Sequence, residues 1–200
     1  MIENDNQGDL KEVWQRVHLA ADEGDHQTLL RLLKQLDCMG VSHATARIGE
    51  FYELGAIGIE KDVDEAARWY RKAVLESDDP VAHLGLGRIY YEGSATVERN
   101  LQTAREHLMR AYDGDMSQAG IYLGQMSMFG AGVTRNLVEA DRFFMAAAVG
   151  GFPIAYTYLA NTAAMSGKFV RTIQMLIKGF FLTVKLKIRD RNHSNLWEPR

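Results

Sequence analysis

The sequence predicts an all-α protein, a right-handed α-solenoid (an αα superhelix) in which antiparallel helix pairs stack side by side. Three observations lead to this prediction. A pattern of small and apolar residues recurs about every 37 residues, and its apolar positions follow helical spacing. The chain also contains 18 glycines but only three prolines, which suits turns that recur between helices.

The recurring pattern predicts the first helix of each pair. An alanine is followed four residues later by an apolar residue, and directly afterwards by glycine or alanine. The four opening alanines, Ala44, Ala82, Ala119 and Ala155, are 38, 37 and 36 residues apart. Residues three and four apart lie on one face of a helix, so the small residues of this face are expected to let a partner helix approach closely.

A second helix is predicted after each of the first three copies. Its apolar face follows the spacing of Ala66, Trp69, Tyr70 and Ala73, which returns at 104–111 and 140–147. A short polar side chain precedes each second helix and is expected to cap it by accepting hydrogen bonds from free backbone N–H groups. These predicted caps are Asp62, Asn100 and Asn136.

The connecting loops contain glycines that are expected to adopt positive φ after a helix end. They are Gly55, Gly58, Gly130 and Gly132. The middle copy departs from this pattern, because Ala95 or Thr96 stands where the second loop glycine is expected and His107 replaces an aromatic residue. We therefore expect a looser or re-formed loop there, and a buried, hydrogen-bonded histidine.

The stretches ARIGEFYELGAIGIEKDVDEAARWYRKAV and GQMSMFGAGVTRNLVEADRFFMAAAVGG resemble the Sel1-like repeat family, a relative of the tetratricopeptide (TPR) arrays. The resemblance covers about residues 44–151. It implies a concave side lined by the first helices, and roles in assembling protein complexes, often in bacterial signalling, envelope or secretion systems. A protein or peptide partner held on that concave face is the function that the resemblance implies.

We interpret residues 1–200 as a single solenoid domain. Its predicted parts are a TPR-like capping pair at 9–40, repeats at 41–80, 81–115 and 116–151, a divergent repeat with a basic amphipathic helix at 152–191, and a tail at 192–200. The stretch VKLKIR in the divergent repeat also alternates like a strand, but its context favours a helix.

The chemistry of an enzyme, a cofactor or a metal site is not expected. The glycines at 85–87 and 130–132 belong to the repeat pattern, and the six histidines lack the spacing of metal ligands. Cys38 has no neighbouring base, so we expect an inert, half-buried thiol. A catalytic group assembled from different repeats stays open as an alternative.

The first helices carry the residues predicted to bind a partner, at positions just after the small residue of the pattern and three further on. They are Glu50, Glu53, Arg88, Tyr91, Gln125, Met128 and Asn161. Acidic, basic, aromatic and methionine side chains together suit a protein or peptide. A merely solvated helix face is an equal alternative.

The C-terminal segment is the second candidate surface. The net charge of −3 divides into −9 for residues 1–167 and +6 for residues 168–200. Residues predicted to contact an anionic membrane or a partner are Lys178, Phe180, Phe181, Lys185, Lys187 and Arg189. A purely structural alternative is that the apolar face of this segment covers the end of the solenoid while its basic face is solvated. Polar residues interrupt the apolar run of this segment, so it is not expected to span a bilayer. The net charge of −9 on residues 1–167 argues against binding to nucleic acid.

The expected location is the bacterial cytoplasm. The single cysteine of the chain can form no internal disulfide. The N-terminal sequence MIENDNQGDLKEVW lacks the basic and apolar regions of a signal peptide. If the C-terminal segment docks on lipid, the alternative function is a factor that recruits a complex to the inner membrane.

Overall fold

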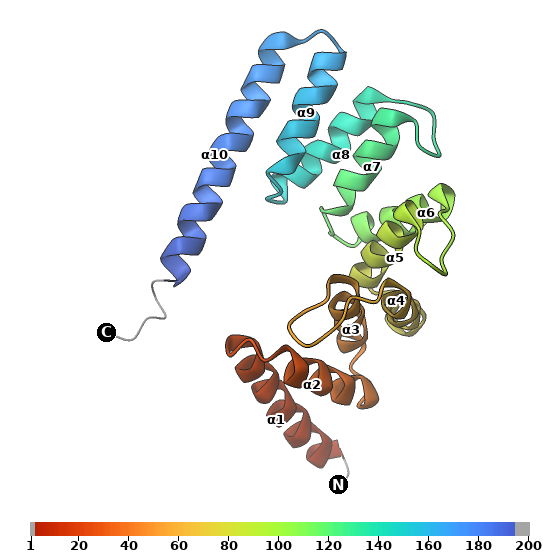
Figure 1. Cartoon of the computed structure of the whole chain (residues 1–200), viewed down its shortest axis with the longest axis vertical. Helices are drawn as coiled ribbons and strands as arrows, with labels where there is room; N and C mark the ends of the chain where they lie inside the picture. Colours follow the sequence, from red (N-terminus) through yellow and green to blue (C-terminus); the bar gives the residue numbers. More distant parts are fainter. Residues whose placement is uncertain (1–2, 195–200) are drawn as a thin grey trace. The chain divides into compact units, whose positions relative to one another are not determined.

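The computed structural model describes residues 3–194, with side chains for 9–41, 43–187 and 189. This part of the chain contains ten α-helices in consecutive antiparallel pairs, which confirms the predicted all-α solenoid class (Figure 1). The helices are α1 (Glu3–Asp22), α2 (His26–Cys38), α3 (Ser42–Leu54), α4 (Val63–Ser77), α5 (Pro80–Glu92), α6 (Leu101–Asp113), α7 (Ala119–Phe129), α8 (Leu137–Val149), α9 (Ile154–Met165) and α10 (Phe169–Ser194).

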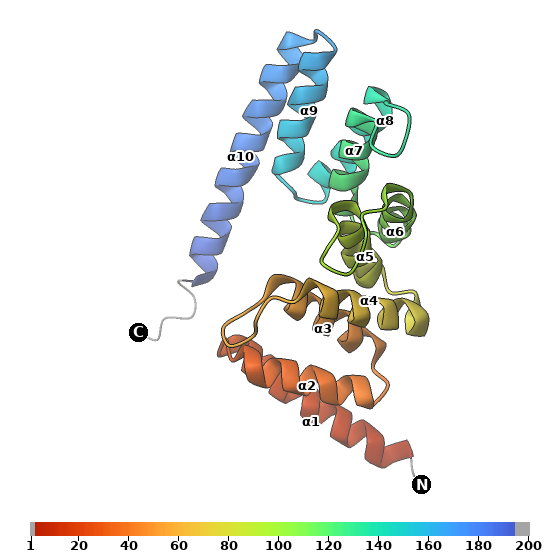
Figure 2. The same cartoon turned by 45° about the vertical axis from the view of Figure 1, so that its right-hand side comes forward.

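The helices belong to two compact units, which are described separately. The first unit, Met1–Met116, contains α1 to α6, and the second, Ser117–Arg200, contains α7 to α10. Within each unit the two helices of a pair lie side by side and run in opposite directions (Figure 2).

The second helix of each repeat begins at the predicted cap. The Asp62 carboxylate accepts a hydrogen bond from the Glu65 backbone N–H at 2.8 Å. Asn100 and Asn136 each accept from two backbone N–H groups, at 3.0 to 3.1 Å. Each cap therefore satisfies donors that the first helical turn leaves without an intrahelical partner.

The loop of the middle repeat is re-formed by a side chain of the neighbouring repeat. The predicted glycines of the other two loops have φ between 70° and 77°. The middle loop instead places the Ser94 hydroxyl 2.5 Å and the Thr96 hydroxyl 2.8 Å from the Asp64 carboxylate on α4. These hydrogen bonds, Ser94 first, hold the pKa of Asp64 below its usual value.

Glycines on one helix allow aromatic rings of a neighbouring helix to pack directly against its backbone in the core of each unit. Tyr70 on α4 is fully buried between Gly49 on α3 and Gly85 on α5. A Cβ atom would lie 2.7 Å from the Tyr70 ring at Gly49 and 2.3 Å from it at Gly85. In the second unit Phe144 is fully buried and stacks on Tyr158, with ring centroids 4.9 Å apart.

The C-terminal stretch is a helix, as its context predicted, and not a strand. Its first turn is joined to α8 by an ion pair between Arg171 and Asp141 at 2.8 Å. Further along, α10 approaches α9 so closely that a Cβ atom at Gly179 would lie 2.9 Å from the Cβ of Tyr156. Cys38 differs from the prediction, because it is exposed at the end of α2 and not half-buried.

Candidate functional site

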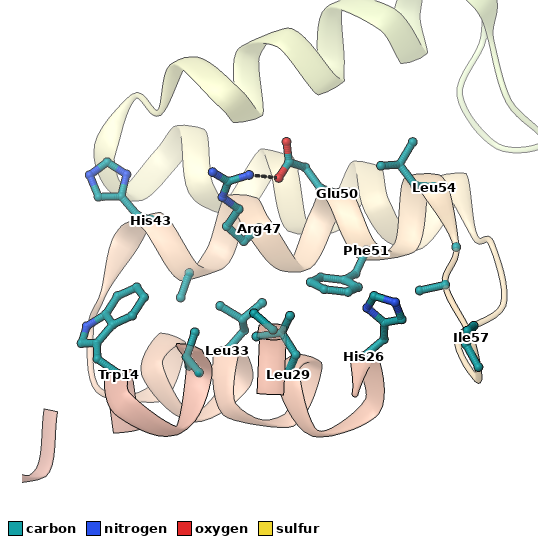
Figure 3. Close-up of a pocket in the computed structure, with 15 residues that line it drawn as sticks. Trp14, His26, Leu29, Leu33, His43, Arg47, Glu50, Phe51, Leu54 and Ile57 are labelled. Atoms are coloured by element: carbon teal, nitrogen blue, oxygen red, sulfur yellow. Dashed lines mark hydrogen bonds and ion pairs between the residues drawn. The ribbon is translucent and has the colours of Figure 1, made fainter. Parts of the chain in front are cut away.

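A groove lies between the first three helices of the first unit (Figure 3). It has a volume of about 890 Å³. One wall comes from α1 and α2, the other from α3, and the loop after α3 closes one end. The side chains that Figure 3 labels in the groove are Trp14, His26, Leu29, Leu33, His43, Arg47, Glu50, Phe51, Leu54 and Ile57.

The groove is apolar, and several of its large side chains are open to solvent. Leu33 is buried at the base, whereas Trp14 is 36% exposed, Leu54 is 71% exposed and Ile57 is 84% exposed. His26 lies against Phe51, with ring centroids 6.1 Å apart. Exposed aromatic and branched side chains around a concave apolar surface are typical of binding sites, because covering them releases ordered water.

The polar rim of the groove comes from the outer face of α3. Arg47 and Glu50 form an ion pair at 2.6 Å, and the His43 ring lies 3.0 Å from the Asp79 carboxylate that caps α5. The pair leaves further donor positions on the Arg47 guanidinium, because one contact uses one of its five N–H groups. The groove can therefore take apolar side chains at its base and hydrogen-bond acceptors at its rim.

Two predicted partner-binding residues form an internal link between repeats. The Arg88 guanidinium on α5 donates to the Glu53 carboxylate on α3 at 2.5 Å, and the Tyr70 hydroxyl donates to the same oxygen at 2.6 Å. The side chains of Arg88 and Glu53 are only 17% and 13% exposed. Burial, and then the neighbouring Glu53 charge, raises the pKa of Tyr70. Most of the surface of Glu53 and Arg88 is thus used inside the unit.

The remaining predicted partner-binding residues vary in exposure. Glu50 lies in the groove, and Tyr91 is half-buried under the Arg99 guanidinium, which lies 5.9 Å from its ring. In the second unit the Gln125 amide donates to the Tyr158 hydroxyl, and Asn161 is exposed. Met128 is 1% exposed within the core of that unit, so it offers a partner almost no surface.

The candidate residues near the C-terminus share α10 and are all exposed. Phe180 and Phe181 are each 66% exposed, with their rings 5.9 Å apart in an edge-to-face arrangement. The four basic residues are Lys178, Lys185, Lys187 and Arg189.

A pair of histidines joins α5 to α6 in the first unit. The Nδ1 atoms of His83 and His107 are 2.8 Å apart, and His83 Nε2 lies 2.8 Å from the Asp78 carboxylate. The His107 ring also stacks on Tyr90. His107 is hydrogen-bonded as predicted, but it is half-buried and not fully buried. In a contact between two Nδ1 atoms one ring donates and the other accepts, so both rings cannot be cations at once.

This pair is expected to make the first unit less stable in acid. Burial, followed by the charge of His83, lowers the pKa of His107 from 6.5. Arg110 and Arg71 lower it further, whereas Glu106 opposes the shift. Because the folded pKa is the lower one, stability is complete above about pH 6.5 and falls as the pH drops toward the folded value, by at most ~1.4 kcal/mol per pH unit.

The measurement is urea unfolding at a series of pH values from about 7.5 to about 5. His107→Phe should flatten the decline, since phenylalanine keeps the stacked ring and takes up no proton. The control His18→Gln changes a histidine on the exposed side of α1. Equal slopes for wild type and His107→Phe would contradict the assignment.

No group of three or more His, Cys, Asp or Glu side chains that could hold a metal ion occurs among the described side chains. Arg47 and Glu50 pair with each other along the rim of the groove, His43 lies beside Asp79, and His26 lies against Phe51. The groove is suited to binding by shape and apolar contact.

Of the predicted partner-binding residues, Glu50 lies in the groove, and the other groove residues were not predicted. Trp14 lies in the pair that was interpreted as a cap, and Leu54 and Ile57 lie at variable positions of the repeat. The sequence did contain one indication of the groove. These large apolar side chains lie outside the positions of the repeat pattern that were expected to form the core.

Comparisons with known proteins agree with the repeat pattern. The Sel1 repeat family matches residues 42–78, 80–116 and 117–148, together more than half of the chain. A Sel1 repeat protein from Oxalobacter formigenes has a similar crystal structure, with a TM-score of 0.73 and 26% identity, over 84% of this chain and 69% of that one.

Two curated proteins are similar in sequence. An uncharacterized protein of Neisseria meningitidis serogroup B is 31% identical over 52% of this chain and 22% of its own length. Chitin synthase regulatory factor 3 of Schizosaccharomyces pombe is 31% identical over 68% of this chain and 14% of its own length. The chain thus spans less than a quarter of each of these two relatives.

Proposed function

Because the chain belongs to the Sel1 repeat family, we propose that it is a non-catalytic scaffold or adaptor that holds a protein partner in the groove between α1, α2 and α3. Such repeats typically mediate protein interactions and are typically non-catalytic. The observation that carries the proposal is the groove itself, which leaves Trp14, Leu54 and Ile57 uncovered.

The chemistry of the groove favours an amphipathic segment of the partner. Its apolar residues would cover Leu29, Leu33 and Phe51 along the base, while acceptor groups would meet Arg47 and His43 at the rim. A helix presents apolar residues on one face at spacings of three and four, which suits a groove built from parallel rows of helical side chains. The Glu50 carboxylate would repel acidic groups of the partner, so these groups would bind on the side of the groove nearer Arg47.

The test is selection of displayed amphipathic peptides on the full chain, followed by affinity measurement with groove variants. Trp14→Ser combined with Leu54→Ser and Ile57→Ser should weaken binding by about 100-fold, because central apolar anchors contribute most of the affinity of an interface. Since these side chains are partly or largely exposed, the fold should persist.

The matched control changes apolar residues of the same unit outside the groove. Leu19 is 60% exposed and Leu75 is 87% exposed, and neither lines the groove. Leu19→Ser with Leu75→Ser should leave peptide affinity within about twofold of wild type. If the groove and control variants bind the selected peptides equally well, the partner occupies another surface and the proposal fails.

The proposal extends to the organisation and location of the chain. The α1–α2 pair would act as the capping pair of the array, and residues 152–191 as a divergent last repeat. The bacterial cytoplasm is the proposed compartment, since an exposed single thiol such as Cys38 is stable where disulfides are reduced. Fractionation of the native cells tests this location.

A further inference from the structure

We propose that α10 docks on the surface of an anionic lipid bilayer, lying in the plane of the headgroups. The site is the outer stripe of the helix, defined by its large apolar side chains that remain exposed. These residues are Phe169, Val170, Ile173, Leu176, Ile177, Phe180, Phe181 and Val184, and they are 36% to 74% exposed. Two of them, Leu176 and Phe180, border α9.

The outer stripe is a continuous surface of one helix. Successive residues turn by about 100°, so positions 169, 173, 176, 177, 180 and 184 fall on the same side. The opposite side faces α9 through Met175, which is 7% exposed, and Gly179. With 26 residues against the 12 of α9, α10 also extends beyond its partner helix (Figure 2).

The charges beside the stripe match a lipid surface. No Asp or Glu occurs between positions 168 and 189, while Lys178, Lys185 and Arg189 fall on one edge of the stripe. Arg171 differs from them, because its guanidinium is paired with Asp141 at the base of the helix. An apolar face bordered by basic residues is the arrangement by which an interfacial helix binds anionic lipid.

A second copy of the chain fits this stripe less well than lipid does. When two copies pair antiparallel through the same stripe, twofold symmetry brings each basic edge against the other. The sequence from 168 to 189 supplies no acid to offset that repulsion. Phospholipid headgroups supply the negative charge, and the acyl chains beneath them cover the phenylalanines.

The helix can lie on a bilayer but cannot cross one. Among residues 3–194, no helix has the length and apolar character that crossing requires. Lys178 interrupts the apolar run of α10 in the middle of the helix, which suits a helix with one wet side. This inference is independent of the groove, because α10 belongs to the second unit and the groove to the first.

The test is co-sedimentation of the full chain with vesicles rich in phosphatidylglycerol and with vesicles of phosphatidylcholine alone. We expect binding to the anionic vesicles that weakens with added salt. Lys178→Glu combined with Lys185→Glu and Lys187→Glu should lower partitioning by about 100-fold or more, since each basic residue near an anionic surface contributes roughly fivefold. Phe180→Ser with Phe181→Ser should abolish binding that survives high salt.

Controls within the second unit separate docking from general effects. Arg135→Glu with Arg142→Glu reverses exposed charges outside α10, and Val138→Ser with Val149→Ser removes apolar side chains that are 74% and 81% exposed. Both should bind vesicles as wild type does. The groove variant of the first unit should also bind them normally, so failure of either proposal is distinguishable.

Three outcomes would overturn the inference. The first is absence of binding to anionic vesicles, and the second is equal binding by the α10 and control variants. The third is self-association, detected by sedimentation velocity, that Phe180→Ser with Phe181→Ser abolishes while vesicle binding is unchanged. In that case the outer stripe is an interface between copies.

Discussion

Replacing Gly124 with leucine is expected to lower the free energy of unfolding of the second unit by about 3 kcal/mol or more. A Cβ atom at this position would lie 2.5 to 2.8 Å from three atoms of the Phe144 ring. Phe144 has no exposed surface and stacks on Tyr158, so its ring has little room to move. Thermal unfolding followed by circular dichroism measures the loss.

A second variant tests whether the contact with Phe144 is the cause. Phe144→Ala alone should be destabilising, because it leaves a cavity in the core. Added to Gly124→Leu, it should recover part of the loss by making room for the new side chain. If the two losses simply add, the pattern glycine does not face Phe144 and the assigned helix contact is wrong.

The same argument applies to the first unit, where Gly87 meets Leu108. A Cβ atom there would lie 2.6 Å from Leu108 Cγ. Gly87→Leu should therefore destabilise the first unit in the way that Gly124→Leu destabilises the second. The parallel follows from the repeat, since both glycines occupy the same position of the recurring pattern.

The helix pairs could be predicted because the signals that set them are local. Asp62, Asn100 and Asn136 cap helices through N–H groups two or three residues away, so a short stretch of sequence contains both partners. The contact between Gly124 and Phe144 was also accessible, because the repeat brings the same two pattern positions together each time. Periodicity thus extended local information to packing between neighbouring helices.

The candidate binding surface could be predicted only in part, because it depends on contacts between repeats. Glu53 and Arg88 occupy positions that appear free when a helix is considered alone, yet they are 35 residues apart in sequence and pair in the fold. Met128 appears equally free and is buried in the core of the second unit. Spacing on one helix does not reveal which face the next repeat covers.

The groove depends on residues that the recurring pattern leaves undefined. Trp14 belongs to a helix before the first repeat, and Ile57 belongs to a loop whose glycines alone are part of the pattern. Their meeting requires the α1–α2 pair to pack against α3, which no local spacing encodes. For α10 the reverse holds, since its apolar and basic residues lie on one helix and the sequence indicated both faces.

The link between Glu53 and Arg88 leads to the second large expected effect. Arg88→Met is expected to cost about 3 kcal/mol in the first unit. The methionine keeps the apolar contacts of the arginine stem. It leaves the Glu53 carboxylate, which is 13% exposed, without the arginine charge and with the hydrogen bond that the Tyr70 hydroxyl donates at 2.6 Å. A mostly buried charge without its partner is destabilising, because it loses water and gains little in return.

Urea unfolding monitored by tryptophan fluorescence measures this loss, since Trp14 and Trp69 both lie in the first unit. The control Arg47→Met breaks an ion pair whose arginine is 62% exposed, and it should change stability by less than about 1 kcal/mol. A smaller difference between the two variants would mean that water reaches the Glu53 carboxylate.

Removing both charges separates the cost of an orphaned carboxylate from the value of the pair. Glu53→Leu with Arg88→Met leaves no buried charge, so much of the loss seen for Arg88→Met should return, apart from about 1 kcal/mol for the Tyr70 hydroxyl that loses its acceptor. Recovery would show that the pair fixes how α3 meets α5 more than it stabilises the unit. Without recovery, the ion pair itself supplies net stability, and the two predicted surface residues are part of the framework that supports the groove.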